Sequence, residues 1–130
     1  MQRKPVAILG ATGMVGQRML QLLAGHPWFE LVYIAASSRS AGKPFKEASV
    51  WRLPGDPPAE LAGMVVGECS PSSLPEGVRL VFSALDSKAA GPIEARFAEA
   101  GCYVISNAGN HRMDPSIPLV IPEVNPGHLE

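Results

Sequence analysis

Near its amino terminus the chain reads Val6-Ala7-Ile8-Leu9-Gly10-Ala11-Thr12-Gly13-Met14-Val15-Gly16. The apolar run before Gly10 is typical of a strand that is buried on both faces of a parallel sheet. A helix is predicted to follow, because apolar residues recur at helical spacing until Gly25 ends the pattern. The residues of this stripe are Val15, Met19, Leu22 and Leu23. Residues 31–36 form a second apolar run, and strand, helix and strand in this order predict parallel strands joined by a right-handed crossover.

Strand-like and helix-like segments alternate along the rest of the chain. Residues 37–63 are predicted to form a long surface excursion with one irregular turn of helix. Only residues 70–77 separate the third and fourth strands, so we do not expect the third strand to follow the plain alternation of a parallel sheet. The further strands are expected at residues 64–66, 78–82, 103–105 and 119–121, and the further helix has the apolar stripe Ala90, Ile93, Phe97 and Ala100. The pattern predicts an α/β fold, a Rossmann-like, doubly wound, mostly parallel sheet with helices on both faces.

Length and composition exclude several classes of protein. At 130 residues, 46% hydrophobic and with a formal net charge of −1, the chain has the profile of one globular domain. No apolar run approaches the roughly 20 residues that span a bilayer, so no membrane partner is expected. Basic residues are concentrated in residues 1–55, but they are scattered and lack interleaved aromatic residues, so we expect no nucleic acid partner. The two cysteines are too few for a disulfide scaffold, and a reducing, cytoplasmic location is expected.

The glycines between the first strand and the first helix are placed to bind a dinucleotide. Gly10 would permit the tight turn, Gly13 would let the backbone approach a pyrophosphate, and Gly16 would allow close packing of the helix on the sheet. The helix N-terminus would offer unpaired N–H groups to the phosphates, and Thr12 would add a hydroxyl. The alternative is an ordinary turn between a strand and a helix.

The residues after the second strand indicate which dinucleotide is bound. The strand ends in Ser37-Ser38-Arg39-Ser40, and no acidic residue occurs between Glu30 and Glu47. NAD-binding domains usually place a carboxylate here to hold the ribose 2′-hydroxyl, whereas a guanidinium and hydroxyls accept a 2′-phosphate. The pattern therefore favours NADP. A serine-rich loop with one solvated arginine is the alternative.

Two later strands are also followed by small polar residues. Ser83-Ala84-Leu85 follows the fourth strand, and Ser106-Asn107-Ala108-Gly109 follows the next one. Ligands of open α/β sheets bind beyond the carboxyl ends of the strands, so both segments are expected near the nucleotide. Ordinary turn chemistry is the alternative for each, because serine, asparagine and glycine favour turns.

Several motifs of the chain are specific when taken together, namely Gly10-Ala-Thr-Gly-Met-Val-Gly-Gln-Arg18, Ala36-Ser-Ser-Arg-Ser-Ala-Gly-Lys43, Phe82-Ser-Ala-Leu85, Ser106-Asn107, His111-Arg112-Met113-Asp114-Pro115 and Pro118-Leu-Val-Ile-Pro-Glu-Val-Asn-Pro126. These motifs together resemble the N-terminal domain of the aspartate-semialdehyde dehydrogenase family, most closely its archaeal and fungal branch. They occur in this order and cover nearly the whole chain. The resemblance implies that residues 1–130 are a dinucleotide-binding domain.

The resemblance also implies a reaction. The family uses NADPH to convert aspartyl phosphate to L-aspartate 4-semialdehyde and phosphate through a cysteine thioester, in lysine, threonine and methionine biosynthesis, and the parent enzyme is expected to be a homo-oligomer. The residues implied at the cofactor are Thr12, Gly13, Met14 and Val15 at its phosphates, Ser37, Ser38, Arg39 and Ser40 at the 2′-phosphate, and Ser83, Ala84, Leu85 and Asn107 along the site. Arg112 resembles the arginine associated with the substrate phosphate, although a surface arginine in a polar loop is an equal alternative.

The chain departs from the family pattern at the nucleophile. The family's Asn-Cys motif comes soon after the Pro-Glu-Val-Asn segment, and the 130 residues hold neither that motif nor the catalytic and dimerisation domain, so no catalytic residue is predicted in them. Cys69 and Cys102 are expected to be structural. The histidines are too dispersed for a metal site. The alternatives are relatives with the same chemistry, such as an N-acetyl-glutamyl-phosphate reductase or a malonyl-CoA reductase, or a non-catalytic nucleotide-sensing module.

Overall fold

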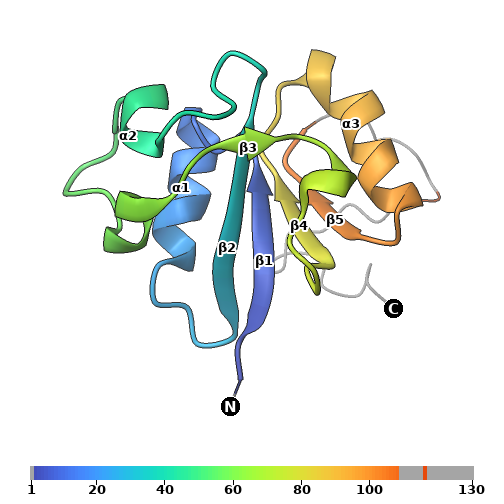
Figure 1. Cartoon of the computed structure of the whole chain (residues 1–130), viewed down its shortest axis with the longest axis horizontal. Helices are drawn as coiled ribbons and strands as arrows, with labels where there is room; N and C mark the ends of the chain where they lie inside the picture. Colours follow the sequence, from blue (N-terminus) through green and yellow to red (C-terminus); the bar gives the residue numbers. More distant parts are fainter. Residues whose placement is uncertain (1, 109–115, 117–130) are drawn as a thin grey trace.

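The computed structural model describes residues 2–108 and residue 116, and these form a five-stranded parallel sheet flanked by helices (Figure 1). The strand order is β3-β2-β1-β4-β5. The strands are β1 (Lys4–Leu9), β2 (Phe29–Ala36), β3 (Gly67–Glu68), β4 (Leu80–Ser83) and β5 (Tyr103–Ser106), and the helices are α1 (Met14–Leu23), α2 (Phe45–Ala48), α3 (Ser87–Glu99) and the 3-10 turns η1 (Ala59–Gly63) and η2 (Pro71–Ser73). The predicted α/β, doubly wound fold is confirmed.

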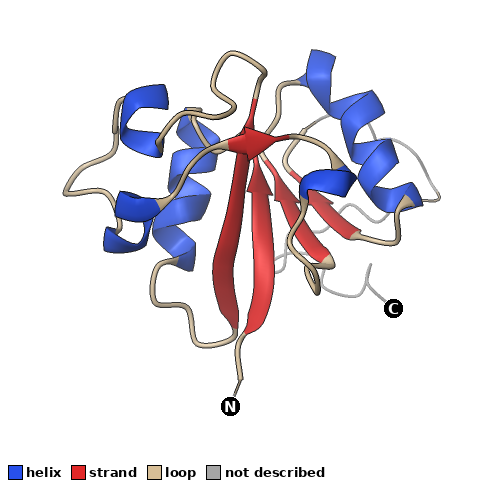
Figure 2. Ribbon diagram, viewed as in Figure 1, coloured by secondary structure: helices blue, strands red, loops and turns tan. Residues whose placement is uncertain are grey.

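The central strand β1 is buried from both sides because helices cover both faces of the sheet (Figure 2). Val6 and Ile8 pack toward α1 and α2, while Ala7 and Leu9 pack toward Phe97 of α3. Side chains alternate between the two faces along a strand, so a continuous apolar run is needed when both faces are covered. This is why the segment before Gly10 contains no polar residue.

The predicted apolar stripe of α1 is only half correct. Leu23 is buried and Met19 packs against the core, whereas Val15 and Leu22 are 43% and 59% exposed. The residues of α1 that are buried are Gly16, Gln17, Leu20 and Leu23. The first turn of α1 packs so closely on the sheet that a glycine and a glutamine occupy the inner face, and a search for apolar periodicity counts neither. In α3 the predicted stripe is nearer to the structure, since only Ala100 of its members is exposed.

The third strand lies three residues later than predicted. Gly67 and Glu68 pair in parallel with Ala35 and Ala36, whereas Val65 forms an isolated antiparallel bridge with Pro44. Residues 69–79 then carry the chain across to β4 with only the turn η2, so this crossover has no α-helix, as its short length indicated. The excursion before β3 holds two short helical turns, α2 and η1, rather than one.

The strand predicted at residues 119–121 lies outside the described residues. Among the residues that are described, no helix is both long and apolar enough to cross a membrane.

Candidate functional site

The loops that follow β1 and β4 are each joined by backbone hydrogen bonds to the end of a neighbouring strand, at one edge of the sheet, the upper edge in Figure 1. The N–H groups of Gly10 and Ala11 both donate to the Ala35 carbonyl, at 2.8 and 3.1 Å, and the Ala84 N–H donates to the Leu9 carbonyl at 2.8 Å. The predicted glycine loop and the start of the predicted Ser83-Ala84-Leu85 segment are therefore neighbours. Since all five strands are parallel, this is also the edge to which Ser106 and Asn107 belong.

The glycines of the loop have different structural requirements. Gly10 has a positive φ of 77°, and a β-carbon on it would lie 2.8 Å from the carbonyl carbon of Ala84. Gly13 is the N-cap of α1, and a β-carbon on it would come no nearer than 3.9 Å to another atom outside its chain neighbours. The loop is thus closed toward the sheet at Gly10 and open at Gly13. This is the arrangement in which a ligand can approach the Gly13 backbone.

The N-terminus of α1 is electrostatically suited to an anion. The first N–H groups of a helix have no partner inside it, and the helix dipole places a partial positive charge there. The first turn of α1 contains no acidic residue, and no side chain caps it. Met14 and Val15, which form that turn, are exposed. A phosphate at this position would receive N–H donors without competition from a carboxylate.

The loop after β2 is a hydrogen-bonded turn with Arg39 at its tip. The N–H groups of Ser40 and Ala41 both donate to the Ser37 carbonyl, at 2.9 and 3.1 Å, and the Gly42 N–H donates to the Val66 carbonyl at 2.7 Å. Ser37, Ser38 and Arg39 are exposed, and Ser40 is half-buried. Within residues 2–108, the Arg39 guanidinium has no ion pair or hydrogen bond. The turn therefore presents a cation that is free to meet an anionic ligand.

The residues that follow β4 and β5, predicted to lie near the nucleotide, differ in how far they are exposed. Ala84 and Leu85 are half-buried beside Gly10, and Asn107 is exposed and donates its backbone N–H to the Ser83 carbonyl at 3.0 Å. Ser83 itself is fully buried, and its hydroxyl has no partner among the described residues. Ser83 thus contributes to this edge of the sheet through its carbonyl, which accepts the hydrogen bond that holds the Asn107 segment in place.

Two polar side chains that the sequence patterns did not predict to be buried lie in the core. Gln17 is fully buried below the glycine loop, and Glu94 is 3% exposed beside Ser106. A signal for both was present, because Gln17 lies three residues before Leu20, and Glu94 lies between Ala90 and Phe97 at helical spacing. A polar residue at such a position faces the core and needs hydrogen-bond partners there.

Neither cysteine has surroundings that lower the pKa of its thiol below the ordinary value. Burial raises the pKa of the Cys69 thiol, and the Gly10 backbone N–H offsets this in part. Burial also raises the pKa of the Cys102 thiol, against a smaller opposite effect of Arg79. A raised pKa leaves a thiol protonated at neutral pH, which is unfavourable for a nucleophile. Cys69 Sγ also lies 3.4 Å from the Ala36 carbonyl, within hydrogen-bond distance.

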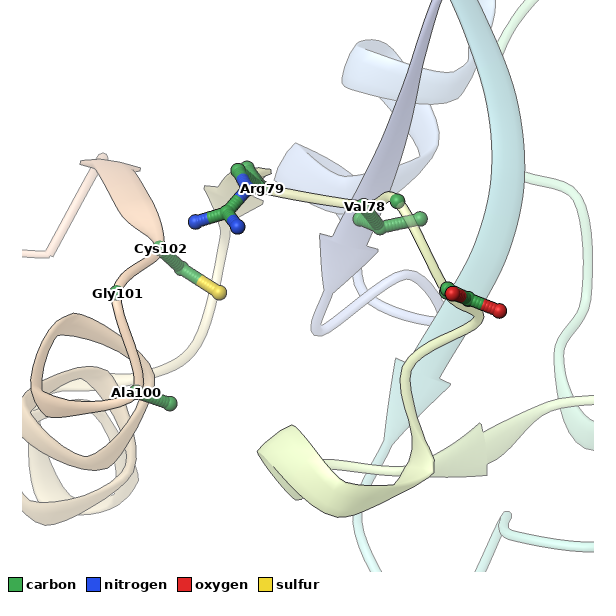
Figure 3. Close-up of a pocket in the computed structure, with 7 residues that line it drawn as sticks. Val78, Arg79, Ala100, Gly101 and Cys102 are labelled. Carbon is green, nitrogen blue, oxygen red and sulfur yellow. The ribbon is translucent and has the colours of Figure 1, made fainter.

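A cavity of about 360 Å³ lies at the opposite edge of the sheet, where β4 and β5 begin (Figure 3). Figure 3 shows Ala100 and Cys102 on one side of this hollow and Val78 on the other, with Arg79 close to Cys102. Its lining residues are Glu76, Gly77, Val78, Arg79, Ala100, Gly101 and Cys102. It contains none of the residues predicted to bind the cofactor. Arg112, predicted at the substrate phosphate, lies outside the described residues.

Comparisons with known proteins point to one family. The family model described as "Semialdehyde dehydrogenase, NAD binding domain" matches residues 5–130. The chain is 46% identical over 127 residues to the aspartate-semialdehyde dehydrogenase of Schizosaccharomyces pombe, covering 98% of this chain and 35% of that protein. It is 51% identical over 126 residues to the enzyme of Methanothermobacter thermautotrophicus, covering 96% and 35%.

A solved structure shares the fold closely. The crystal structure of the Candida albicans aspartate-semialdehyde dehydrogenase with NADP superimposes with a TM-score of 0.93 at 47% sequence identity, covering 98% of this chain and 36% of that one. The chain thus spans about a third of the length of the relatives it matches.

Proposed function

The chain belongs to the semialdehyde dehydrogenase family, and we propose that residues 1–130 are the NADP-binding domain of an aspartate-semialdehyde dehydrogenase. The whole protein would reduce aspartyl phosphate to L-aspartate 4-semialdehyde and release phosphate. The observation that carries this proposal is one sheet edge on which the open glycine loop, the uncapped N-terminus of α1 and the exposed Arg39 occur together.

The described residues fit the phosphates of a dinucleotide. Gly13 leaves room for a pyrophosphate beside the backbone, and the first N–H groups of α1 would donate to it, with the Thr12 hydroxyl nearby. Met14 and Val15 would line the same position. When bound, NADPH supplies the hydride that reduces the acyl group. The chain's own residues would bind and orient it.

The preference for NADP over NAD rests on the turn after β2. Arg39 would form a charge-assisted hydrogen bond with the 2′-phosphate, and the hydroxyls of Ser37, Ser38 and Ser40 would add donors. The absence of an acidic residue between Glu30 and Glu47 removes the repulsion that a 2′-phosphate would otherwise meet. Ala84, Leu85 and Asn107 would form the wall farther along the site, with Ser83 supporting it from beneath.

The remaining parts of the reaction are assigned by the family resemblance. The nucleophilic cysteine would lie in the family's Asn-Cys motif rather than at Cys69 or Cys102, whose raised pKa values do not suit that role. Arg112 would hold the substrate phosphate. We further propose a homo-oligomeric enzyme in the cytoplasm, in keeping with two cysteines that are free.

Two measurements test the proposal. Titration with NADPH and NADH, followed by cofactor fluorescence, should show tighter binding of NADPH. The whole protein, which would include the family's Asn-Cys motif, should then turn over L-aspartate 4-semialdehyde with phosphate and NADP⁺. It should not turn over the semialdehyde of N-acetyl-glutamate, or malonyl-CoA with NADPH. Tighter binding of NADH would overturn the cofactor assignment. Turnover of another acyl substrate would place the protein elsewhere in the family, and binding without any turnover would favour a nucleotide-sensing module.

A further inference from the structure

Gln17 is a fully buried amide in the first turns of α1, where the helix faces the sheet. A buried polar side chain is costly unless its hydrogen bonds are made. Gln17 makes them with residues 49–52, a segment more than 30 positions away in the sequence. Its Nε2 group donates to the Val50 carbonyl at 2.8 Å and to the Ser49 hydroxyl at 3.0 Å, and its Oε1 accepts from the Arg52 N–H at 2.9 Å.

The same hydrogen bonds continue into the glycine loop. The Ser49 hydroxyl, which accepts from Gln17, donates to the Thr12 carbonyl at 2.8 Å. The Gln17 amide also lies 3.4 Å from that carbonyl. The Ser49 hydroxyl therefore holds the Thr12 carbonyl on the side of the 49–52 segment, and the Gln17 amide, whose two N–H groups already donate to Ser49 and Val50, adds at most a weaker, shared contact. We call the hydrogen bonds from Gln17 through Ser49 to Thr12 the relay. The relay joins α1 and the 49–52 segment to the glycine loop through the Thr12 carbonyl oxygen.

The orientation of that carbonyl matters because Thr12 and Gly13 share a peptide plane. The C=O and the N–H of a trans peptide point in opposite directions, so fixing one fixes the other. Gly13 has no side chain to restrict rotation of this plane, and its N–H makes only a long contact, 3.4 Å, with the Gly10 carbonyl. Without the relay, that contact alone would oppose a turn of the Thr12 carbonyl oxygen toward the N-terminus of α1. An oxygen in that position would repel a phosphate. The relay selects the orientation that keeps the N-terminus of α1 clear for an anion.

We propose that Gln17 and Ser49 are positioning residues of the glycine loop, and that their hydrogen bonds to Thr12 set its affinity for the cofactor pyrophosphate. Neither side chain would touch the cofactor. The inference rests on the proposed NADP site and predicts that affinity depends on the Ser49 hydroxyl, not merely on the volume at position 49.

The test compares NADPH with adenosine 2′-phosphate, which carries the 2′-phosphate but no pyrophosphate. Ser49→Ala should raise the NADPH dissociation constant about 2- to 12-fold, the factor that corresponds to one net hydrogen bond. Gln17→Met, which removes both the Nε2 donor and the Oε1 acceptor of the amide, should raise the NADPH dissociation constant further. Neither should change the affinity for adenosine 2′-phosphate by more than about twofold. Ser49→Thr, which keeps the hydroxyl, should restore NADPH binding.

Gln21→Met is the matched control, because Gln21 lies one turn farther along α1 and bonds only to Arg18 among the described residues. It should bind both ligands as the wild type does. If Gln17→Met does not fold, the Ser49 pair decides the question. Equal NADPH affinity in Ser49→Ala and wild type, or equal weakening of both ligands, would overturn the inference alone. Failure of the wild type to bind NADPH would overturn the proposed function and the inference with it.

Discussion

Gly16 lies so close to Gly10 that a β-carbon on Gly16 would be 2.1 Å from the Gly10 carbonyl oxygen. The next atoms it would meet are the Cα and carbonyl carbon of Ala11, at 2.8 and 2.9 Å. All three are backbone atoms, so none can move aside by a side-chain rotation. This contact sets how near α1 stands to the end of β1, and therefore where its first N–H groups lie relative to the glycine loop.

Gly16→Ala is expected to lower the free energy of unfolding by about 1–3 kcal/mol, because the new methyl group forces the backbone apart. The roughly 1 kcal/mol gained in helix propensity does not offset this. Urea denaturation measures the difference. Gly63→Ala is the control, since a β-carbon there meets nothing within 4 Å, and it should change stability by less than about 1 kcal/mol. A Gly16→Ala variant as stable as the wild type would contradict the packing argument.

Arg39→Asp is expected to reverse the cofactor preference. Loss of a charge-assisted hydrogen bond, worth ~1.5–3 kcal/mol, should weaken NADPH binding by about 10- to 150-fold, and repulsion by the new carboxylate adds to the loss. NADH should lose little, because its 2′-hydroxyl can donate to that carboxylate. Titrations at two salt concentrations measure both affinities, since exposed ionic contacts are screened.

The control for this prediction is Arg3→Asp, which makes the same charge change just before β1, at the other end of the sheet. It should leave the ratio of the two affinities unchanged. If Arg39→Asp weakened NADH and NADPH equally, Arg39 would support the loop and would not select the cofactor.

The thiols of Cys69 and Cys102 should react slowly at neutral pH. Burial raises the pKa of both groups, so at pH 7.5 a smaller fraction is thiolate than in a free thiol. Iodoacetamide should label both more slowly than it labels glutathione, and the rates should rise with pH through the raised pKa values. Mass spectrometry of the labelled peptides distinguishes the two sites. Labelling of either cysteine at pH 7.5 as fast as glutathione would reopen it as a candidate nucleophile.

Ser106→Ala is expected to destabilise the fold by about 1–3 kcal/mol. The Ser106 hydroxyl donates to Oε2 of Glu94 and accepts from the Ala108 N–H at 2.9 Å. Oε1 of Glu94 has no partner among the described residues, so the substitution would leave a 3% exposed carboxyl without a hydrogen bond there. Thermal unfolding measures the loss. Ser72→Ala, at an exposed hydroxyl, should be nearly neutral, and an equal effect of the two substitutions would show that the Glu94 contact contributes nothing.

The exposed apolar side chains of the edge strand β5 should promote self-association of the chain. Tyr103 and Ile105 are 73% and 53% exposed on one face of β5, in register with Leu80 and Phe82 of β4. Exposed apolar surface of this kind promotes association. Tyr103→Ser combined with Ile105→Thr should reduce self-association in sedimentation velocity and lower the fluorescence of a hydrophobic dye. Val65→Thr, at another exposed position, serves as the control, and unchanged association of the double variant would argue against this face.

Local sequence patterns were sufficient for the order of the main elements and for the candidate cofactor site. The apolar run before Gly10 and the basic, acid-free turn at Arg39 are each recognised from residues that are adjacent in the sequence. Because the strands are parallel, their carboxyl ends meet at one edge of the sheet. The fold class could therefore be predicted from one chain, whereas the cofactor-binding roles of the residues at the glycine loop and at the β2 turn stay predictions.

The face of α1 that packs on the sheet could be predicted only in part. The glycine motif predicted close packing at Gly16, and a β-carbon there would lie 2.1 Å from the Gly10 carbonyl oxygen. Apolar periodicity favoured Val15 and Leu22 instead of Gln17, which is buried because the 49–52 segment supplies its hydrogen-bond partners. Likewise, Ser83 reads as a ligand residue in the sequence, whereas its position in the sheet buries its hydroxyl. Burial and hydrogen bonding depend on atoms contributed by distant segments, and their positions relative to one another arise only when the chain has folded.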